Sequence, residues 1–344
     1  MTDIRCNAFP KKNNLEWLRL IFAVQVVFSH AASHFDLGFK FLRFVQNFPG
    51  VPAFFFVSGF LIYSSYLNSP GKRYFENRFL RLFPGLLLVT IGGGGVIVFV
   101  QGWGSLLNHA STYFFWFLSQ ITLGQAYNPE LFRTVGVGVI NGSLWTITTE
   151  ILFYLSVPII VWLEKRFRFS VVVLIVISFV IYAVGPSVLG NVVYRDKSIF
   201  DVLALTPIVW GWMFGFGIVA VKYYEHIKRQ IKYMPVLLIP LVVMVYWGDG
   251  VLFQPAGGRL GIIYFTCYVA LILWFAFCLP VVMLPFDISY GAYIWHMPVI
   301  NLLVAYKVHS MALAITLTLL VATLSWFLVE KPMLRLKHQS IRPV

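Results

Sequence analysis

Long apolar runs recur along the whole chain, separated by short polar or charged stretches. Eleven such runs are visible, at about 15–35, 50–67, 82–100, 110–124, 142–163, 169–189, 201–221, 234–248, 260–284, 288–306 and 310–329. A helix needs about 20 residues to cross the hydrocarbon core of a bilayer, and lipid tolerates only segments whose backbone groups are paired internally. The pattern therefore predicts an all-α, polytopic integral membrane protein.

Composition agrees with a bilayer as the solvent for this chain. Of its 344 residues, 59% are hydrophobic, 18% are aromatic and only 11% are charged, whereas about a quarter of an ordinary soluble domain is charged. A soluble core of this length cannot hide so much apolar surface. The net charge of +13 would suggest nucleic acid in a soluble protein, but here we expect no nucleic-acid partner, because the charges lie between apolar runs.

The positive charges predict the topology. They form five clusters: Arg5, Lys11 and Lys12; Lys72, Arg73, Arg78 and Arg81; Lys165, Arg166 and Arg168; Lys222, Lys228, Arg229 and Lys232; and Lys331, Arg335, Lys337 and Arg342. Cytoplasmic loops carry the excess of Lys and Arg, so an even number of spans should separate each pair of clusters. This holds only if the short run at 110–124, which is diluted by polar residues, does not cross. We expect about ten transmembrane helices, one short re-entrant or interfacial segment on the outer side, and cytoplasmic N- and C-termini.

The chain reads as one membrane domain, because no internal repeat, linker or low-complexity stretch divides it. Glu16 and Arg19 interrupt the start of the first apolar run, which indicates a first transmembrane helix rather than a cleaved signal peptide.

Ionisable residues inside spans cost about 2.5–3.5 kcal/mol on insertion scales and usually mark function. The first run carries Arg19 and His30, about 16 Å apart along a helix. A histidine can accept a proton from a hydroxyl near neutral pH, so His30 is a candidate general base. The alternative is a packed, satisfied histidine with Arg19 reaching to the interface. His34 lies one helical turn after His30, but without a further acidic ligand we predict no metal site.

Two further spans carry candidate groups. Glu150 lies about eight residues into the run at 142–163, among hydroxyl side chains and Tyr154. A carboxylate at that depth needs a partner, an aqueous cavity or a proton; the alternative is a structural hydrogen bond between helices. His296 lies near the middle of the run at 288–306, before Pro298, where a cavity-lining role and a core role are both open.

Arg78 and Arg81 lie at the end of the third span that the topology places in the cytoplasm, and their spacing of three puts both on one helix face. Arginine forks suit phosphate groups. The alternative is that both arginines bind anionic lipid headgroups. In the span at 201–221, Gly211 and Gly215 predict a close helix contact.

Together, these segments resemble the membrane-bound acyltransferase 3 family over about 13–335. The resemblance rests on six elements in order: the first span with R-x10-H, "PAFFFVSGFLI", "FENRFLRLFP", "SLWTITTEILFY", "SYGAYIWHMPV" and "LSWFLVEKP". Residues 336–344 would form a short basic cytoplasmic tail. Residues of these elements that we expect to contact substrate or line a cavity are Ser58, Trp145, Tyr154 and His296.

The resemblance implies an O-acyltransferase, most often an O-acetyltransferase, that moves an acyl group from acetyl-CoA or another acyl-CoA to a sugar hydroxyl. The acceptor would be a cell-surface polysaccharide such as O-antigen or a lipid-linked sugar, at a bacterial inner membrane. It implies essential roles for His30 and Arg19, with Glu150 as a third catalytic candidate. Arg78 and Arg81 would bind the acyl-CoA, helped by Lys72 and Arg73. No metal cofactor is implied.

Some relatives carry an extracytoplasmic esterase-like domain, which is not expected here. The protein would then acylate a small or lipid-linked acceptor itself or pass the acyl group to a separate partner. Direct attack by the acceptor and an acyl-histidine intermediate both stay open. The alternative function is a proton-coupled transporter or flippase, since buried His, Glu and Arg suit proton coupling; the missing internal symmetry argues against it.

Overall fold

The computed structural model describes residues 9–38, 40–194, 197–255 and 260–339, and what it describes is almost wholly helical. Arg5 and residues 340–344 of the expected tail, which include Arg342, lie outside this range. The α-helices are α1 (Leu15–His34), α2 (Lys40–Gln46), α3 (Gly50–Asn68), α4 (Lys72–Gln101), α5 (Trp103–Asn108), α6 (Ala110–Gln120), α7 (Trp145–Arg166), α8 (Ser170–Val188), α9 (Ile199–Leu203), α10 (Pro207–Lys222), α11 (Tyr224–Ile227), α12 (Leu238–Trp247), α13 (Gly250–Phe253), α14 (Ile262–Cys278), α15 (Ser289–Ala305), α16 (Met311–Ser325) and α17 (Lys331–Gln339).

Shorter elements join these helices. They are the 3-10 helices η1 (Glu130–Thr134), η2 (Gly142–Leu144) and η3 (Ile231–Leu237), the π-helical turn η4 (Trp326–Glu330), and the antiparallel pair β1 (Val193–Tyr194) and β2 (Lys197–Ser198).

Six helical segments in the described parts of the chain are long and apolar enough to cross a membrane. They are Leu15–His34, Phe44–Asn68, Lys72–Gln101, Gly142–Arg166, Ser170–Val188 and Met311–Leu336. Shorter apolar helices cover Pro207–Lys222, Ile231–Trp247 and Ile262–Cys278. The chain is thus a multi-pass membrane protein, as its hydrophobic pattern predicts. The number of ten crossings and the cytoplasmic termini stay predictions. The run at 110–124 forms α6, whose 11 residues are fewer than the about 20 that one span needs.

The chain divides into two compact units. Unit 1 comprises Met1–Phe22, Arg43–Tyr74 and Thr149–Leu284, and unit 2 comprises Ala23–Leu42, Phe75–Thr148 and Pro285–Val344.

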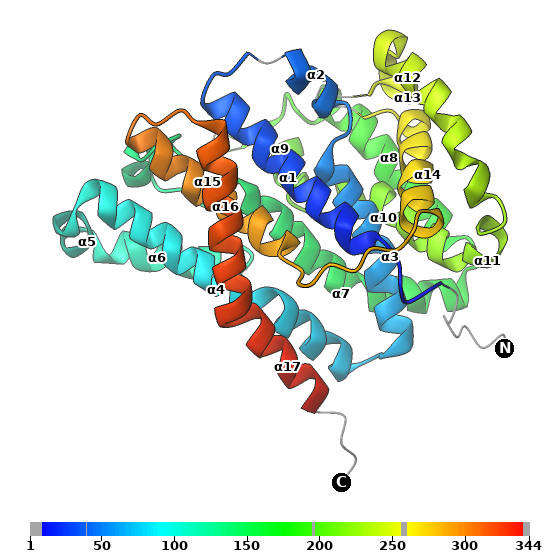
Figure 1. The fold of residues 1–344 in the computed structure, drawn as a ribbon, viewed down its shortest axis with the longest axis horizontal. Helices are drawn as coiled ribbons and strands as arrows, with labels where there is room; N and C mark the ends of the chain where they lie inside the picture. The colour runs from blue at the N-terminus through cyan, green and yellow to red at the C-terminus, as the bar shows by residue number, and fades with distance from the viewer. Residues whose placement is uncertain (1–8, 39, 195–196, 256–259, 340–344) are drawn as a thin grey trace. The chain divides into compact units, whose positions relative to one another are not determined.

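Close backbone contact organises unit 1, where α10 packs between α3 and α8 (Figure 1). A Cβ added at Gly59 of α3 would lie 2.0 Å from the carbonyl oxygen of Phe214, and one at Gly217 of α10 would lie 2.1 Å from that of Phe56. On the α8 side, a Cβ at Gly215 would lie 2.5 Å from the Ile175 side chain. The close helix contact predicted from the Gly211–Gly215 spacing is therefore confirmed.

We expect Gly59→Val to prevent stable packing of α3 on α10. Because the obstacle is a backbone carbonyl, no side chain can move aside, and overpacking should cost about 3 kcal/mol or more. Fluorescence-detected size exclusion of heated, detergent-solubilised protein would measure the loss. The matched control is Gly95→Val, also inside a helix, where an added Cβ meets nothing within 4 Å. Equal melting temperatures for both variants would contradict this account of the contact.

The outward face of α8 is apolar. Its exposed side chains include Val172, Val173, Val176, Ile177, Val180, Val184 and Val188. In a soluble protein a stripe of this kind would mark an interface, but in a membrane protein it is the surface that meets lipid.

Glu164 of α7 is a buried carboxylate that has two partners. It accepts hydrogen bonds from Lys222 at 2.6 Å and from the Tyr63 hydroxyl at 2.5 Å, and the lysine neutralises its charge.

Unit 2 has its core where α15 packs along α16 (Figure 1). One apolar cluster joins the end of α1 to these two helices through Ala31, Phe35, Met297, Ile300 and Ala314. A second cluster joins α4 and α6 to η1 and the segment after it. Its members are Ile97, Tyr113, Trp116, Phe132, Val135 and Ile140. The first cluster holds the end of α1 against α15, and with them the candidate site.

Candidate active site

Two histidines from distant parts of the sequence meet inside unit 2. His30 of α1 and His296 of α15 have ring centroids 5.0 Å apart, and His296 Nε2 lies 3.3 Å from His30 Nδ1. His296 is fully buried, while His30 is half-buried. The Met297 sulfur lies 3.2 Å from the same Nδ1 of His30. The structure thus brings one candidate base into contact with the second intramembrane histidine.

The hydrogen bonds determine which ring nitrogens carry protons when both rings are neutral. His296 Nδ1 lies 2.6 Å from the Tyr293 carbonyl oxygen; a carbonyl only accepts, so Nδ1 is the protonated nitrogen. His296 Nε2 then carries a lone pair and accepts from His30 Nδ1–H. This leaves His30 Nε2 unprotonated, which is the state that a general base or nucleophile needs.

Polar contacts hold the turn of α15 that carries His296. The Tyr293 hydroxyl lies 2.7 Å from Thr146 Oγ1, and that threonine also donates to the Ser143 carbonyl at 2.9 Å. The Asn141 amide donates to the Ile294 carbonyl at 2.8 Å. Thr146 at the start of α7 and Asn141 before η2 therefore both hold the turn of α15 that carries His296. The Thr146 hydroxyl makes the contact with Tyr293.

Asn301, one turn beyond Met297 on α15, is fully buried and holds the loop before Asn141. Its Oδ1 accepts from the Val137 N–H at 2.9 Å, and its Nδ2 donates to the carbonyls of Val139 and Ile140 at 2.9 and 3.1 Å. Gly136 adopts φ +54°, and a Cβ there would lie 2.4 Å from Asn301 Oδ1. Sequence reasoning missed Asn301; a lone amide inside an apolar run was the available signal.

We expect Asn301→Ala to destabilise unit 2. The change leaves buried backbone groups of the loop unpaired, and each such group costs about 1–3 kcal/mol. The variant should melt several degrees below the wild type in detergent and should yield less folded protein. Asn191→Ala is the matched control, because its amide makes a single exposed hydrogen bond to Ser187. A wild-type melting temperature for Asn301→Ala would refute the role given to this amide.

The arginines expected to hold acyl-CoA lie on one face of α4. Arg81 forms an ion pair with Asp287, whose other oxygen accepts from the Ser289 N–H at 3.2 Å and its hydroxyl at 2.6 Å. The carboxylate therefore links α4 to the start of α15. Arg78, one turn earlier, is half-buried. Sequence reasoning did not single out Asp287, since an acidic residue before a helix is an ordinary capping signal.

The other predicted site residues fall in both units. Trp145 is half-buried at the start of α7 in unit 2. Those in unit 1 are Arg19 on α1, Ser58 on α3, Lys72 and Arg73 at the exposed start of α4, and Glu150 and Tyr154 on α7.

Within unit 1, the Tyr154 hydroxyl donates to Glu150 Oε1 at 2.5 Å, and the Tyr74 hydroxyl donates to the Tyr154 carbonyl at 3.1 Å. Glu150 thus has a hydrogen-bonding partner on its own helix. Within the described residues, no group of three or more His, Cys, Asp or Glu side chains is placed to hold a metal ion.

Comparison with known proteins places this arrangement in a family. Residues 12–330 match the family model described as an acyltransferase domain. Nodulation protein 10 of Rhizobium leguminosarum bv. viciae is 27% identical, over 96% of this chain and 95% of its own length. The O-acetyl transferase of Shigella phage Sf6 is 29% identical, over 93% of this chain and 96% of its own length. No solved structure matches. Because the family model covers nearly the whole chain, this protein belongs to the acyltransferase 3 family and is an acyltransferase.

Proposed function

We propose that this protein transfers an acetyl group from acetyl-CoA to a hydroxyl of a cell-surface or lipid-linked sugar. The observation that carries the proposal is the contact between His30 Nδ1 and His296 Nε2, which leaves the other nitrogen of His30 as a base. The family supplies acyl transfer. The relative named as an O-acetyl transferase favours acetyl as the group and oxygen as its acceptor.

The proposed reaction begins with proton removal. His30 Nε2 takes the proton of the acceptor hydroxyl, and that oxygen attacks the thioester carbonyl carbon. The carbon–sulfur bond breaks, and the CoA thiolate leaves with the proton from the imidazolium. In the alternative sequence, His30 Nε2 attacks the thioester carbonyl carbon, the carbon–sulfur bond breaks and the CoA thiolate is displaced. The sugar hydroxyl then attacks the acetyl carbonyl on His30, the carbon–nitrogen bond breaks, and the hydroxyl proton passes to the CoA thiolate. His296 keeps the His30 ring in one tautomer and one orientation in both versions.

Acyl-CoA binding is assigned to the basic face of α4. Arg78 and Arg81 would hold phosphates of CoA as bidentate donors, and Lys72 and Arg73 at the exposed start of the same helix would add positive charge. The ion pair with Asp287 restricts the Arg81 side chain, so less conformational entropy is lost when phosphate binds.

Arg19 and Glu150 are the remaining polar groups of the proposed catalytic set. Arg19 is proposed as an essential cation on the same helix as His30, because a charged side chain inside a span usually marks function. Glu150, hydrogen-bonded to Tyr154, is proposed to help orient the acceptor. Ser58 and Trp145 are proposed to contact the substrates. Under the charge-based topology, His30 lies in the outer half of the bilayer, and the acceptor would be presented from outside at a bacterial inner membrane.

The test follows label from donor to acceptor. Membranes from cells that express the protein, and from cells with an empty vector, would receive CoA labelled in the acetyl group. We expect label in the lipid-linked or polysaccharide fraction only when the protein is present, and its release by mild base as acetate. Label that stays in CoA across acceptors of both kinds would refute the sugar acetyltransferase assignment.

A further inference from the structure

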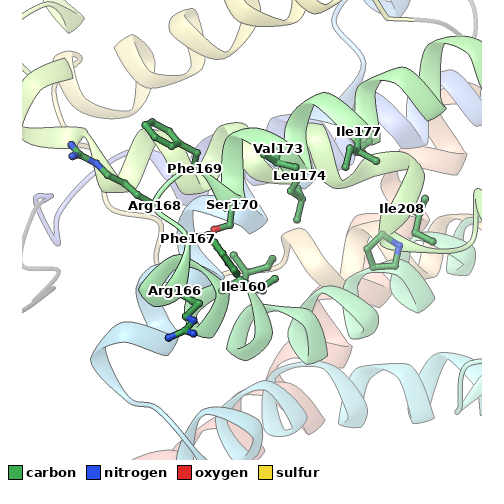
Figure 2. Close-up of a pocket in the computed structure, with 13 residues that line it drawn as sticks. Ile160, Arg166, Phe167, Arg168, Phe169, Ser170, Val173, Leu174, Ile177 and Ile208 are labelled. Atoms are coloured by element: carbon green, nitrogen blue, oxygen red, sulfur yellow. The ribbon is translucent and has the colours of Figure 1, made fainter.

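An apolar groove crosses the lipid-facing side of unit 1. It lies between α7, α8 and the start of α10 and has a volume of about 880 Å³, within the about 300–1,000 Å³ typical of ligand sites. Its walls include Ile160, Leu174, Ile177 and Ile208 (Figure 2). We propose that this groove binds one anionic phospholipid, with an acyl chain along α8 and the phosphate at the arginines between α7 and α8.

Length and exposure fit an acyl chain. The groove follows α8 from Ser170 to Ser178, about 12 Å at 1.5 Å per residue, which approaches the about 15 Å of one leaflet. Val173 and Ile177 on its wall are exposed, so the groove opens toward the surrounding lipid. Ser178, at the far end, is already satisfied, because its hydroxyl accepts from the Trp212 N–H at 2.9 Å.

Charge makes the two ends of the groove different. Arg166 and Arg168 both lie at one end of the groove, near Phe167 and Phe169, with their side chains pointing in different directions (Figure 2). Among the described residues, no charged side chain lines the opposite end, at Ile177 and Ile208. Both arginines are exposed, as headgroup-binding side chains must be. A zwitterionic lipid would fill the same groove but would bind less tightly, because its headgroup has no net negative charge to attract two guanidinium groups.

A buried hydroxyl supplies a second polar contact at the charged end. The Ser170 Oγ atom is buried and, in the part of the chain that the structure describes, has no hydrogen-bond partner. Buried hydroxyls are nearly always paired. Ser170 lines the groove at the start of α8, at the same end as the two arginines (Figure 2), where a phosphate or ester oxygen of the lipid would accept its proton.

The test measures lipid binding rather than activity. Full-length protein, purified and stripped of lipid in detergent, would be titrated with phosphatidylglycerol or phosphatidylcholine and followed by native mass spectrometry. We expect one tight phosphatidylglycerol site, and we expect Arg166→Gln/Arg168→Gln to weaken it about thirtyfold. Arg229→Gln/Lys232→Gln removes the same charge elsewhere in unit 1 and should leave binding unchanged.

A second variant tests the groove itself. Val173→Trp fills the apolar wall, keeps both arginines, and should abolish the tight site. Inorganic phosphate should not displace the lipid, because the acyl chain supplies part of the affinity. Equal binding of the two lipids by the wild type would overturn the proposal, as would unchanged phosphatidylglycerol binding in either groove variant. A dimer whose formation competes with lipid would show that a second copy covers the groove instead.

Discussion

Replacing His30 with alanine should reduce acetyl transfer by about 10²–10⁴-fold, the range that a general acid–base group contributes. The reason is that the reaction needs the lone pair on one nitrogen of His30, Nε2. The contact with His296 assigns the proton to His30 Nδ1, so Nε2 carries the lone pair that accepts the hydroxyl proton or the acetyl group. Alanine removes that lone pair, while the apolar neighbours Ala31 and Phe35 still hold the end of α1 against α15.

The measurement is the initial rate of label transfer from acetyl-CoA at matched amounts of folded protein. His109→Ala is the control, since that exposed histidine between α5 and α6 contacts only a backbone carbonyl in the described structure, and it should transfer at the wild-type rate. If His30→Ala transfers as fast as His109→Ala, the imidazole is a packing element and the catalytic assignment is wrong.

A comparison of the wild type with His30→Gln separates the two reaction sequences. A quenched wild-type reaction without acceptor should hold base-labile label on the protein if an acyl-histidine forms, and His30→Gln should hold none. Label on the variant equal to that on the wild type would place any covalent intermediate on another side chain.

Helix positions were largely predictable because lipid imposes a simple rule. A helix in a bilayer must pair its backbone and face apolar solvent, so its sequence is an uninterrupted apolar run. The runs at 15–35 and 50–67 correspond to α1 and α3 within one residue at each end. Gly211 and Gly215 of α10 likewise predicted a close helix contact without naming its partner, which is α8, because small residues let two helices approach closely.

Helix ends departed from the apolar runs where proline and capping residues intervene. The run at 201–221 divides into α9 and α10, because the Thr206 hydroxyl accepts from the Ile208 N–H and Pro207 favours the first position of a new helix. The run at 260–284 stops as a helix at Cys278, since Leu279 precedes a proline and is extended. Apolar residues continue on both sides of each break, so the apolar pattern alone could not locate the breaks.

The candidate site was predictable residue by residue but not as an arrangement. His30 and His296 can each be identified from the sequence, because an ionisable side chain inside a span costs free energy and usually has a function. Their contact joins positions 266 apart in sequence, for which no periodicity exists. Asn301 and Asp287 escaped notice for a related reason, because their partners are backbone groups or an arginine on distant segments. Local sequence encodes the need for a partner, whereas the fold determines which partner it is.

His296 has the second-largest expected effect, through the orientation of His30. We expect His296→Phe to lower kcat about 10²-fold, the loss that a misplacement of about 1 Å can produce, with little change in KM for acetyl-CoA. Phenylalanine fills the space of a fully buried ring but cannot accept from His30 Nδ1–H. The His30 ring is then free to turn, and the fraction of molecules with Nε2 directed at the acceptor falls.

A conservative variant distinguishes this role from simple packing. In His296→Gln, the amide nitrogen can donate to the Tyr293 carbonyl and the amide oxygen can accept from His30 Nδ1, so both hydrogen bonds of the native ring are retained. We expect His296→Gln to recover most of the kcat that His296→Phe loses, although it fills the cavity less well. Met297→Leu, which keeps the volume beside His30 but removes the sulfur, should change kcat by less than about threefold, since a thioether is a weak acceptor. If His296→Phe is active and His296→Gln is not, packing rather than the proton arrangement explains why His296 is buried against His30, and the base must be oriented by a different group.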